Sequence, residues 1–524
     1  MGAGPVRVDA RRETLRHELA ATAEEMGEVL TRAAFSPNIK ERRDHSCAIF
    51  DAQARLLAQA EHIPVHLGSM PLAVEGILDE LGPLAEGEVA VSNDPRAGGT
   101  HLPDLTMVAP VFHASKRVGY LAARAHHADV GGSSAASMPA SASTLQAEGL
   151  VVPPVIAARE GDWVEDVREL VLANTRTSRE RAGDLAAQRG ALAVGCRRLA
   201  ALADRHGPEQ LAARGAAILD HTEDRAKAQL QEAEEGTWEA KTPVETAQGQ
   251  AQLAVEITVD GASVHVDYAG TDPALAGNLN APFPVALAGV VYASRVVLGG
   301  DVPSNAGFRR VLSVEAPAGS IVDPPPGAAV AGGNVETSQR NVDVLFDALA
   351  GAFDQVPAHS QGTMNNVTLG GRADGRPFAY YETLGGGEGA TPRRGGASGL
   401  HTHMTNTRNT PAETLEHRLP FRVRAQRLRP GTGGEGRNRG GDGIERAIEV
   451  LVDGVEVNLL TNRRRTRPEG RAGGQPGAAG RNAIRRAGGD VEELGPIAQA
   501  ELATGDVLVV ETPGGGGYGS AEDD

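Results

Sequence analysis

The sequence predicts an α+β protein with several domains, mixed sheets, one long helical segment and glycine-rich loops, and three observations support this class. The chain has 524 residues, which exceeds one ordinary hydrophobic core and favours two or three packed domains. Apolar residues with helical spacing alternate along the chain with short segments of strand spacing. The 66 glycines indicate many tight turns, because glycine adopts backbone angles that other residues avoid.

Residues 1–240 are expected to form an N-terminal domain that includes the helical segment. This segment, residues 165–235, is rich in Ala, Leu, Arg and Glu, and its charged rows are interpreted as solvated helix faces. The other elements predicted for this domain are a helix over 9–34, strands over 46–51 and 89–92, a helix over 71–81, and a hairpin of 105–112 with 118–125.

Residues 241–524 are expected to form a C-terminal mixed α/β domain, because the composition changes near residues 236–250. The dipeptide Asp260-Gly261 is a strong turn signal between two alternating segments and predicts a hairpin. The last third of the chain is rich in glycine and is expected to contain short strands. The elements predicted for this domain are strands over 253–259 and 262–268, helices over 282–299 and 341–353, and a strand over 507–511 before the glycine run 514–517.

The overall charge and the cysteine content exclude some classes of partner and compartment. The formal net charge is −17 and the pI is near 5.4, which disfavours nucleic acid and anionic membranes as partners. Cys47 and Cys196 are the two cysteines, too few for a disulfide framework and typical of a reducing compartment. No segment approaches the roughly 18 apolar residues of a membrane span, and the N-terminus has no apolar signal region. We therefore expect a soluble, cytoplasmic protein.

Five residues that can bind a metal flank the predicted hairpin 105–125. His101 and Asp104 end the glycine-rich loop that enters the first strand, whereas His126, His127 and Asp129 follow the end of the second. The start of one antiparallel strand lies beside the end of the next, so the two groups should meet. Imidazole and carboxylate ligands suit Mn, Zn or Fe, and the absence of thiolates disfavours a closed structural zinc site. The pattern predicts a divalent metal centre able to assist hydrolysis.

Two other interpretations of these residues stay open. The histidines could be loop residues that cap strand ends, which would be the better interpretation for a single histidine. Strand alternation places His126 and His127 on opposite faces, so one of them is expected to contact the ion directly. Asp129 could be a ligand, a catalytic carboxylate or the acceptor that sets a histidine tautomer.

Polar residues upstream of this hairpin are weaker candidates. Glu41 and Asp44 are either catalytic carboxylates or part of a structural ion-pair network with Arg42. His62 and His66 flank Pro64 in an apolar context and are interpreted as buried core histidines, and the preceding Glu61 is a possible additional carboxylate ligand.

The segment 332–340 opens a helix and offers backbone amides together with Thr337 and Arg340, an arrangement that can bind an anion of the substrate. A simple N-cap is the alternative. The glycine loops 385–389 and 431–443 match neither the GxxxxGK[ST] phosphate loop nor a dinucleotide fingerprint. We therefore expect that this chain does not bind ATP itself.

Several stretches between about residue 36 and residue 443 occur together and in order. They are SPNIKERRDHSCAIFD, HIPVHLGSMP, NDPRAGGTHLPDLTMVAPVF, AHHADVGG, GNVETSQR, GGGEGA, HTHMTNTRNTPAETLE and GRNRGGDG. In these stretches the chain resembles the hydantoinase B / 5-oxoprolinase family, which includes the α subunits of acetone and acetophenone carboxylases. One departure lies after AHHADVGG, where Ala135 and Ala136 precede Ser137-Met138 and related sequences tend to have Pro-Gly.

The resemblance implies a division of labour with an ATPase-type, hydantoinase A-like subunit that phosphorylates the amide oxygen of a cyclic amide. The present chain would then complete hydrolysis of a hydantoin, 5-oxoproline or another lactam as part of a hetero-oligomer. The resemblance also supports His101, Asp104 and His126 as ligands of a Mn-like ion. One alternative is the α subunit of an ATP-dependent ketone carboxylase, and another is a non-catalytic scaffold for the ATPase partner.

Overall fold

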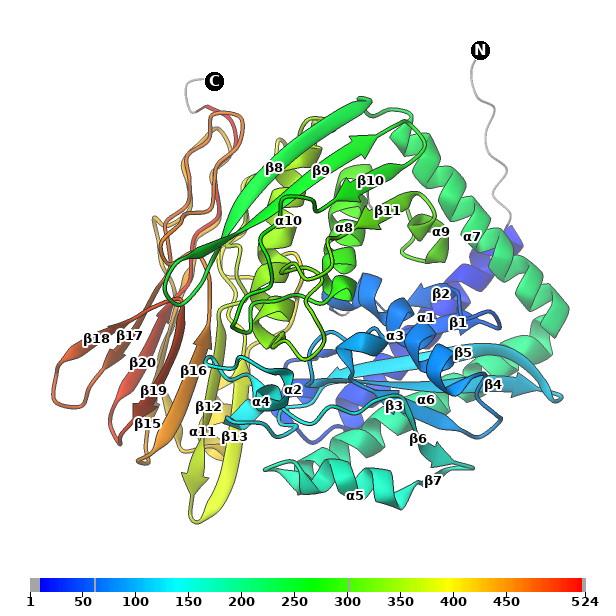
Figure 1. The fold of residues 1–524 in the computed structure, drawn as a ribbon, viewed down its shortest axis with the longest axis horizontal. Coiled ribbons are helices and arrows are strands. Elements are labelled where there is room, and N and C mark those ends of the chain that lie inside the picture. Colours follow the sequence, from blue (N-terminus) through cyan, green and yellow to red (C-terminus); the bar gives the residue numbers. More distant parts are fainter. Residues whose placement is uncertain (1–9, 61–62, 300–301, 521–524) are drawn as a thin grey trace.

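The computed structural model describes residues 10–60, 63–299 and 302–520 and contains the expected mixture of helices and sheets (Figure 1). Its first unit is a seven-stranded sheet in the order β2-β1-β5-β4-β3-β6-β7, in which neighbouring strands run antiparallel. The strands are β1 (His45–Asp51), β2 (Leu56–Gln59), β3 (Val89–Ser92), β4 (Asp104–His113), β5 (Lys116–His126), β6 (Val155–Arg159) and β7 (Asp162–Trp163).

Helices cover both faces of this sheet because successive side chains along its strands point to opposite faces, and both faces are apolar. Cys47 and Ile49 of β1 pack with α1 (Ala10–Ala33) and α6 (Ser178–His206), whereas Ala48 and Phe50 pack with α3 (Val65–Leu81). Two further helices complete the N-terminal region, α5 (Glu165–Ala173) and α7 (Pro208–Leu230). The short helices of this region are α2 (Pro37–Lys40), η1 (Pro95–Ala97), η2 (Ala135–Ser137) and α4 (Leu145–Glu148).

A second sheet, ordered β11-β10-β9-β8, lies against two helices in the upper part of Figure 1. It combines antiparallel pairs with one parallel pair, β10 with β11. One apolar core extends from Ile63 to Leu460 and joins this layer to Val65 at the start of α3 and to Ala226 and Leu230 of α7. The elements are β8 (Gly236–Glu245), β9 (Gln250–Val259), β10 (Val264–Asp267), α8 (Phe283–Leu298), α9 (Ala306–Arg309), β11 (Leu312–Glu315), a π-helical segment η3 (Gly333–Thr337) and α10 (Ser338–Leu349).

Two more sheets pack face to face at the left of Figure 1 and share an apolar core between Val367 and Val510. Their orders are β13-β12-β16-β19 and β14-β15-β20-β17-β18. The elements are β12 (Asn366–Ala373), β13 (Arg376–Glu382), α11 (Ala412–Arg418), β14 (Phe421–Leu428), β15 (Ile444–Val450), β16 (Val455–Leu460), β17 (Arg481–Arg485), β18 (Val491–Leu494), β19 (Ile497–Leu502) and β20 (Val507–Glu511).

Glycine-rich segments without regular secondary structure run side by side next to these sheets, and we call residues 386–389, 433–443, 470–477 and 514–517 the glycine stack. Backbone hydrogen bonds join them, for example from Gly434 N to Gly515 O at 2.8 Å and from Gly515 N to Gly441 O at 2.9 Å. The approach is too close for side chains: a Cβ on Gly515 would lie 2.0 Å from the carbonyl oxygen of Glu388. Glycine is therefore required at this position.

The structure confirms the α+β class and most of the predicted elements, but the helix predicted from Pro71 begins earlier, at Val65. Gly68 in this additional part packs closely on α8, because a Cβ there would lie 2.6 Å from Ala288 Cα. Burial against α8 therefore outweighs the helix-breaking tendency of Pro71, which lies inside the helix. The hairpin predicted around Asp260-Gly261 is confirmed by the pairing of β9 with β10. The domain boundary near residue 240 stays a prediction.

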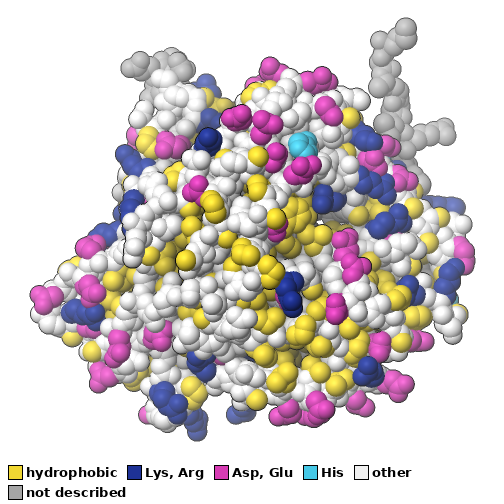
Figure 2. Space-filling view, in the orientation of Figure 1, with side chains coloured by type: hydrophobic (Ala, Val, Ile, Leu, Met, Phe, Trp, Pro, Cys, Tyr) yellow, Lys and Arg dark blue, Asp and Glu magenta, His cyan; other side chains and the backbone are white. Residues whose placement is uncertain are grey.

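Acidic and basic side chains are interspersed over the face of the molecule drawn in Figure 2. That face therefore offers no continuous basic surface of the kind that binds nucleic acid. Across the described ranges, no helix combines the length and apolar character needed to cross a membrane.

Candidate metal centre

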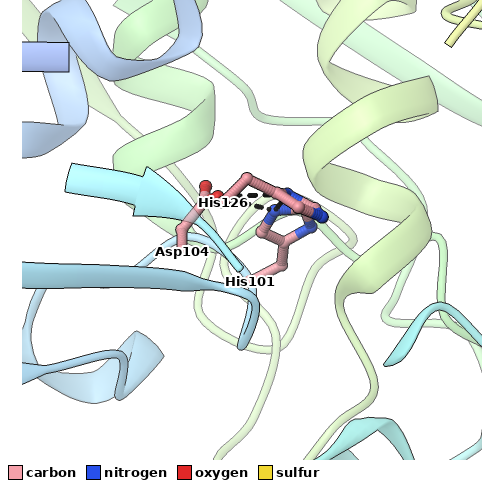
Figure 3. A group of neighbouring side chains, drawn as sticks. All are labelled: His101, Asp104 and His126. Carbon is pink, nitrogen blue, oxygen red and sulfur yellow. Dashed lines mark hydrogen bonds and ion pairs between the residues drawn. The ribbon is translucent and has the colours of Figure 1, made fainter. Parts of the chain in front are cut away.

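Three of the predicted ligands converge at the ends of two neighbouring strands (Figure 3). Asp104 begins β4 and His126 ends β5, and the two residues are direct partners in the antiparallel register. Opposite residues in such a register project their side chains to the same face of the sheet. His101 lies three residues before Asp104, and a backbone hydrogen bond of 3.1 Å from Asp104 N to His101 O closes the turn between them.

The candidate ligand atoms form a small triangle. Asp104 Oδ1 lies 3.0 Å from His101 Nε2 and 3.3 Å from His126 Nδ1, and the two nitrogens are 3.1 Å apart. A tetrahedral ion with bonds of about 2.0–2.2 Å separates its ligand atoms by roughly 3.3–3.6 Å, and an octahedral ion by roughly 2.8–3.1 Å. The observed separations fit a divalent ion between the three groups. All three side chains are buried, so an ion there would be held away from bulk water.

The charge states of Asp104 and His126 favour binding of a cation. Burial by itself would raise the pKa of Asp104, but His101 and the hydrogen bonds from the surrounding imidazoles hold it well below its usual value. Thr100 Oγ1 also donates to Asp104 Oδ2 at 2.7 Å. Burial lowers the pKa of His126, which favours the neutral imidazole whose lone pair can bind a metal. The centre therefore combines an ionised carboxylate with a neutral histidine.

A small cavity of about 20 Å³ lies at the cluster. This volume exceeds the roughly 10–15 Å³ that a water molecule needs and is far too small for a cyclic amide. Both predicted halves of the chain line the cavity. The lining residues are Asp44, Ile63, Val65, His66, His101, Asp104 and His126 from the N-terminal half, and Asn334, Val335, Met364, Tyr381, Thr383 and Thr405 from the C-terminal half.

His66 lies at the cluster, although the sequence pattern favoured a core role for it. Its Nε2 is 3.5 Å from Asp104 Oδ2, and its Nδ1 is 2.8 Å from Ser46 Oγ. Helical spacing offered a signal, because His66 shares a helix face with Met70 and Val74, which pack on the same sheet face as Asp104. Glu61 and His62 lie outside the described residues.

The structure places His127 and Asp129 away from the triangle. His127 faces α6, where Nε2 contacts Gln188 Oε1 at 3.0 Å and Nδ1 contacts Arg181 Nη1 at 2.9 Å. Strand alternation explains this separation from His126, since successive side chains point to opposite faces. Asp129 instead orders the following loop: its Oδ2 accepts from Ala136 N at 3.1 Å and from Arg176 Nη1 at 3.0 Å. Neither residue is brought to the other three.

Of the two upstream carboxylates, Asp44 lines the cavity and Glu41 does not. Burial raises the pKa of Asp44, while His126 and Arg42 act in the opposite direction. Arg42 is buried and its nearest contact with Asp44 is long, at 3.9 Å. Its closer bonds are to Asn38, to Tyr381 O at 3.1 Å and to Thr383 Oγ1 at 2.8 Å. Arg42 thus joins the two halves of the chain beside the cluster.

The predicted anion-binding pair, Thr337 and Arg340, has internal partners instead. Thr337 Oγ1 donates to Leu279 O at 2.5 Å. Arg340 bonds to Asp343, to Thr242 and to Pro243 O, the last at 3.1 Å. The contacts of Arg340 tie α10 to β8, and neither Thr337 nor Arg340 lines the cavity. The carboxylate three positions along the same helix was the signal of this internal role.

Comparison with known proteins identifies one family over almost the whole chain. The family model described as hydantoinase B/oxoprolinase matches residues 9–521. An uncharacterised protein of Methanocaldococcus jannaschii is 38% identical, with 97% of this chain and 90% of that protein covered. A 5-oxoprolinase of Dictyostelium discoideum is 34% identical over 97% of this chain, but the chain spans only 40% of its length.

Solved structures share the fold. The crystal structure of the ATP-dependent caprolactamase from Pseudomonas jessenii superposes with a TM-score of 0.88 and 25% identity, covering 98% of this chain and 92% of that chain. A nucleotide-free acetone carboxylase gives a TM-score of 0.89 at 17% identity, covering 98% of this chain and 76% of that one. At such low identity, the second likeness is evidence for the fold alone.

Proposed function

Because the chain belongs to the hydantoinase B/oxoprolinase family, we propose that it is the metal-binding component of an ATP-dependent hydrolase of cyclic amides. The observation that carries this proposal is the buried triangle of His101, Asp104 and His126. It lies in a chain similar to a 5-oxoprolinase and to an ATP-dependent caprolactamase. The substrate class is a hydantoin, 5-oxoproline or another lactam, and the proposed location is the cytoplasm.

The chemistry of these residues supports a hydrolytic role. A bound Mn, Zn or Fe ion would act as a Lewis acid and lower the pKa of water. His101, Asp104 and His126 would hold the ion, while Thr100 and His66 orient the carboxylate of Asp104. We assign to Asp44 the transfer of a proton at its carboxylate, since it lines the same cavity and burial favours its protonated form.

We further propose that a separate ATPase-type, hydantoinase A-like subunit uses the ATP. The glycine loops 385–389 and 431–443 lack the phosphate-loop pattern. Both contribute to the glycine stack, where backbone segments already fill the space. The chain spans 40% of the Dictyostelium 5-oxoprolinase, which leaves room in that relative for another activity. A hetero-oligomer follows, because an activated amide must pass from one component to the other.

The proposal is tested with the chain purified together with its ATPase partner. We expect about one divalent ion per chain, and hydrolysis of a lactam that requires ATP. His101→Ala and Asp104→Asn should each lose the ion and the activity. His113→Ala is the matched control, because His113 lies at the other end of β4 and pairs with Asp204 on the surface.

Metal-free wild-type protein with full activity, or full activity in His101→Ala, would overturn the metal-centre proposal. A requirement for bicarbonate and a ketone substrate would replace the hydrolase with a carboxylase. Lactam hydrolysis by this chain alone, without a second subunit, would remove the two-component arrangement. An ATPase partner that keeps full lactamase activity when this chain carries both substitutions would leave only the scaffold role.

A further inference from the structure

Among the described residues, none accepts a hydrogen bond from the second nitrogen of His126. Its Nδ1 faces Asp104 and His101, whereas the buried Nε2 meets no acceptor in the described part of the chain. A metal-binding imidazole usually donates its second N–H to a carboxylate or a carbonyl, and this bond sets the orientation of the ring. Another contact must therefore hold His126 in the plane that directs Nδ1 to the cluster.

The ring of Tyr381 provides that contact. The two rings stack with a centroid separation of 4.5 Å and an interplanar angle of 11°. Tyr381 is 3% exposed and lies on β13, in the C-terminal half of the chain. A nearly parallel stack restricts rotation of the imidazole about its Cβ–Cγ bond, because a turned ring would collide with the aromatic face.

Tyr381 is itself held at its ring and at its hydroxyl. Arg42 places its guanidinium carbon 4.7 Å from the centroid of the tyrosine ring. The Tyr381 hydroxyl donates to Asn366 Oδ1 at 2.8 Å, and Asn366 Nδ2 donates to Glu336 Oε1 at 2.8 Å and to Leu460 O at 2.9 Å. Glu336 belongs to the π-helical segment that also supplies two lining residues of the cavity. The ring is therefore a fixed surface rather than an adaptable one.

We propose that Tyr381 is a positioning residue that sets the plane of the His126 imidazole and so maintains the affinity and geometry of the metal centre. This inference rests on the proposed metal-binding function. It also gives the C-terminal half a defined part in a centre whose ligands all come from the N-terminal half. Asn366 and Glu336 act one step further away, by holding the hydroxyl of Tyr381.

The experiment compares three variants of the full chain. Tyr381→Leu removes the aromatic face, and Tyr381→Phe keeps the face but removes the hydroxyl. Tyr380→Leu is the matched control: Tyr380 is the preceding residue of β13 and is also 3% exposed, but it points to the other face of the sheet and packs on Phe421. Manganese affinity is measured by calorimetry, and coordination geometry by the visible spectrum of the Co²⁺-loaded protein.

Tyr381→Leu should weaken Mn²⁺ binding about 10- to 100-fold, the usual effect of losing a group that orients a metal ligand, and should change the Co²⁺ spectrum. Tyr381→Phe should show a smaller loss, and Tyr380→Leu should bind both ions like the wild type even if its melting temperature falls. Unchanged affinity and spectrum in Tyr381→Leu would overturn the positioning role but leave the metal site intact. Equal losses in the Tyr380 and Tyr381 variants would also overturn it. A wild-type chain that binds no divalent ion would instead refute the proposed function.

Discussion

The packing of α3 on α8 predicts opposite effects for the same substitution in two helices. Gly68 and Gly190 both lie inside helices, α3 and α6. A Cβ on Gly68 would lie 2.6 Å from Ala288 Cα and 2.9 Å from Ala288 N, whereas a Cβ on Gly190 would meet no atom within 4 Å. Since carbon atoms make contact at about 3.5–4.0 Å, Gly68→Ala forces the two helices apart by roughly 1 Å.

The free energies of these two changes can be compared directly. Alanine is preferred to glycine inside a helix by about 1 kcal/mol, so Gly190→Ala should stabilise the protein by about that amount. Gly68→Ala gains the same term but incurs an overpacking cost of about 1–3 kcal/mol, and this cost lies at the upper end because the obstructing atoms are backbone. The net effect is a destabilisation of about 1–2 kcal/mol. His66 lies two residues away on α3, so its contact with Asp104 should lengthen as well.

Urea unfolding followed by circular dichroism measures both changes. The midpoint should rise for Gly190→Ala and fall for Gly68→Ala, and manganese affinity should fall in Gly68→Ala alone. A Gly68→Ala protein that is as stable as Gly190→Ala would refute the close approach of α3 and α8. A destabilised Gly68→Ala protein with unchanged metal affinity would refute the link from this packing to His66.

Three further outcomes follow from buried charges and from the metal. Asp343→Ala should destabilise the chain by about 3–5 kcal/mol in urea unfolding, because Arg340 and Arg463 share this buried carboxylate; an effect below 1 kcal/mol would contradict it. Mn²⁺ at a hundred times its Kd should stabilise the folded state by about 2.7 kcal/mol, seen as a higher melting temperature that Asp104→Asn abolishes and that EDTA reverses. Burial raises the pKa of Glu148 to about 8, against hydrogen bonds from Val330 N and Ala331 N. The contribution of Glu148 to the free energy of unfolding is therefore fully present below the pKa that it has in the unfolded chain, and it is lost as the pH rises to about 8. The stability of Glu148→Gln relative to wild type should increase over that interval, and a constant difference would exclude the shift.

The parts of the centre that the sequence predicts are those that depend on local chain geometry. Asp104 and His126 belong to one hairpin, whose alternating pattern and short turn allow their pairing to be expected from the sequence. Strand alternation likewise separates His127 from His126. These inferences need only the neighbouring strand.

The remaining parts depend on contacts between distant segments. Tyr381 reaches His126 from a strand more than 250 positions along the chain, and no periodicity in the sequence specifies that meeting. Arg340 shows how a distant contact can change the role that a local pattern predicts. It lies at a helix start that could hold an anion, but it bonds instead to Thr242 and Pro243. Tertiary packing decides which of several plausible partners a polar side chain has.

The glycine stack changes how the surface loops of this protein should tolerate mutation. Loops usually accept substitutions because their side chains point into solvent, but here the crowding is between backbones. A methyl group on Gly440 would lie 2.1 Å from the carbonyl oxygen of Gly515, and one on Gly517 would lie 2.2 Å from that of Glu435. Even the smallest side chain would thus separate several segments at once. Their amide protons should exchange slowly with deuterium although they belong to no helix or strand, so this part of the surface behaves as a second core made of main chain.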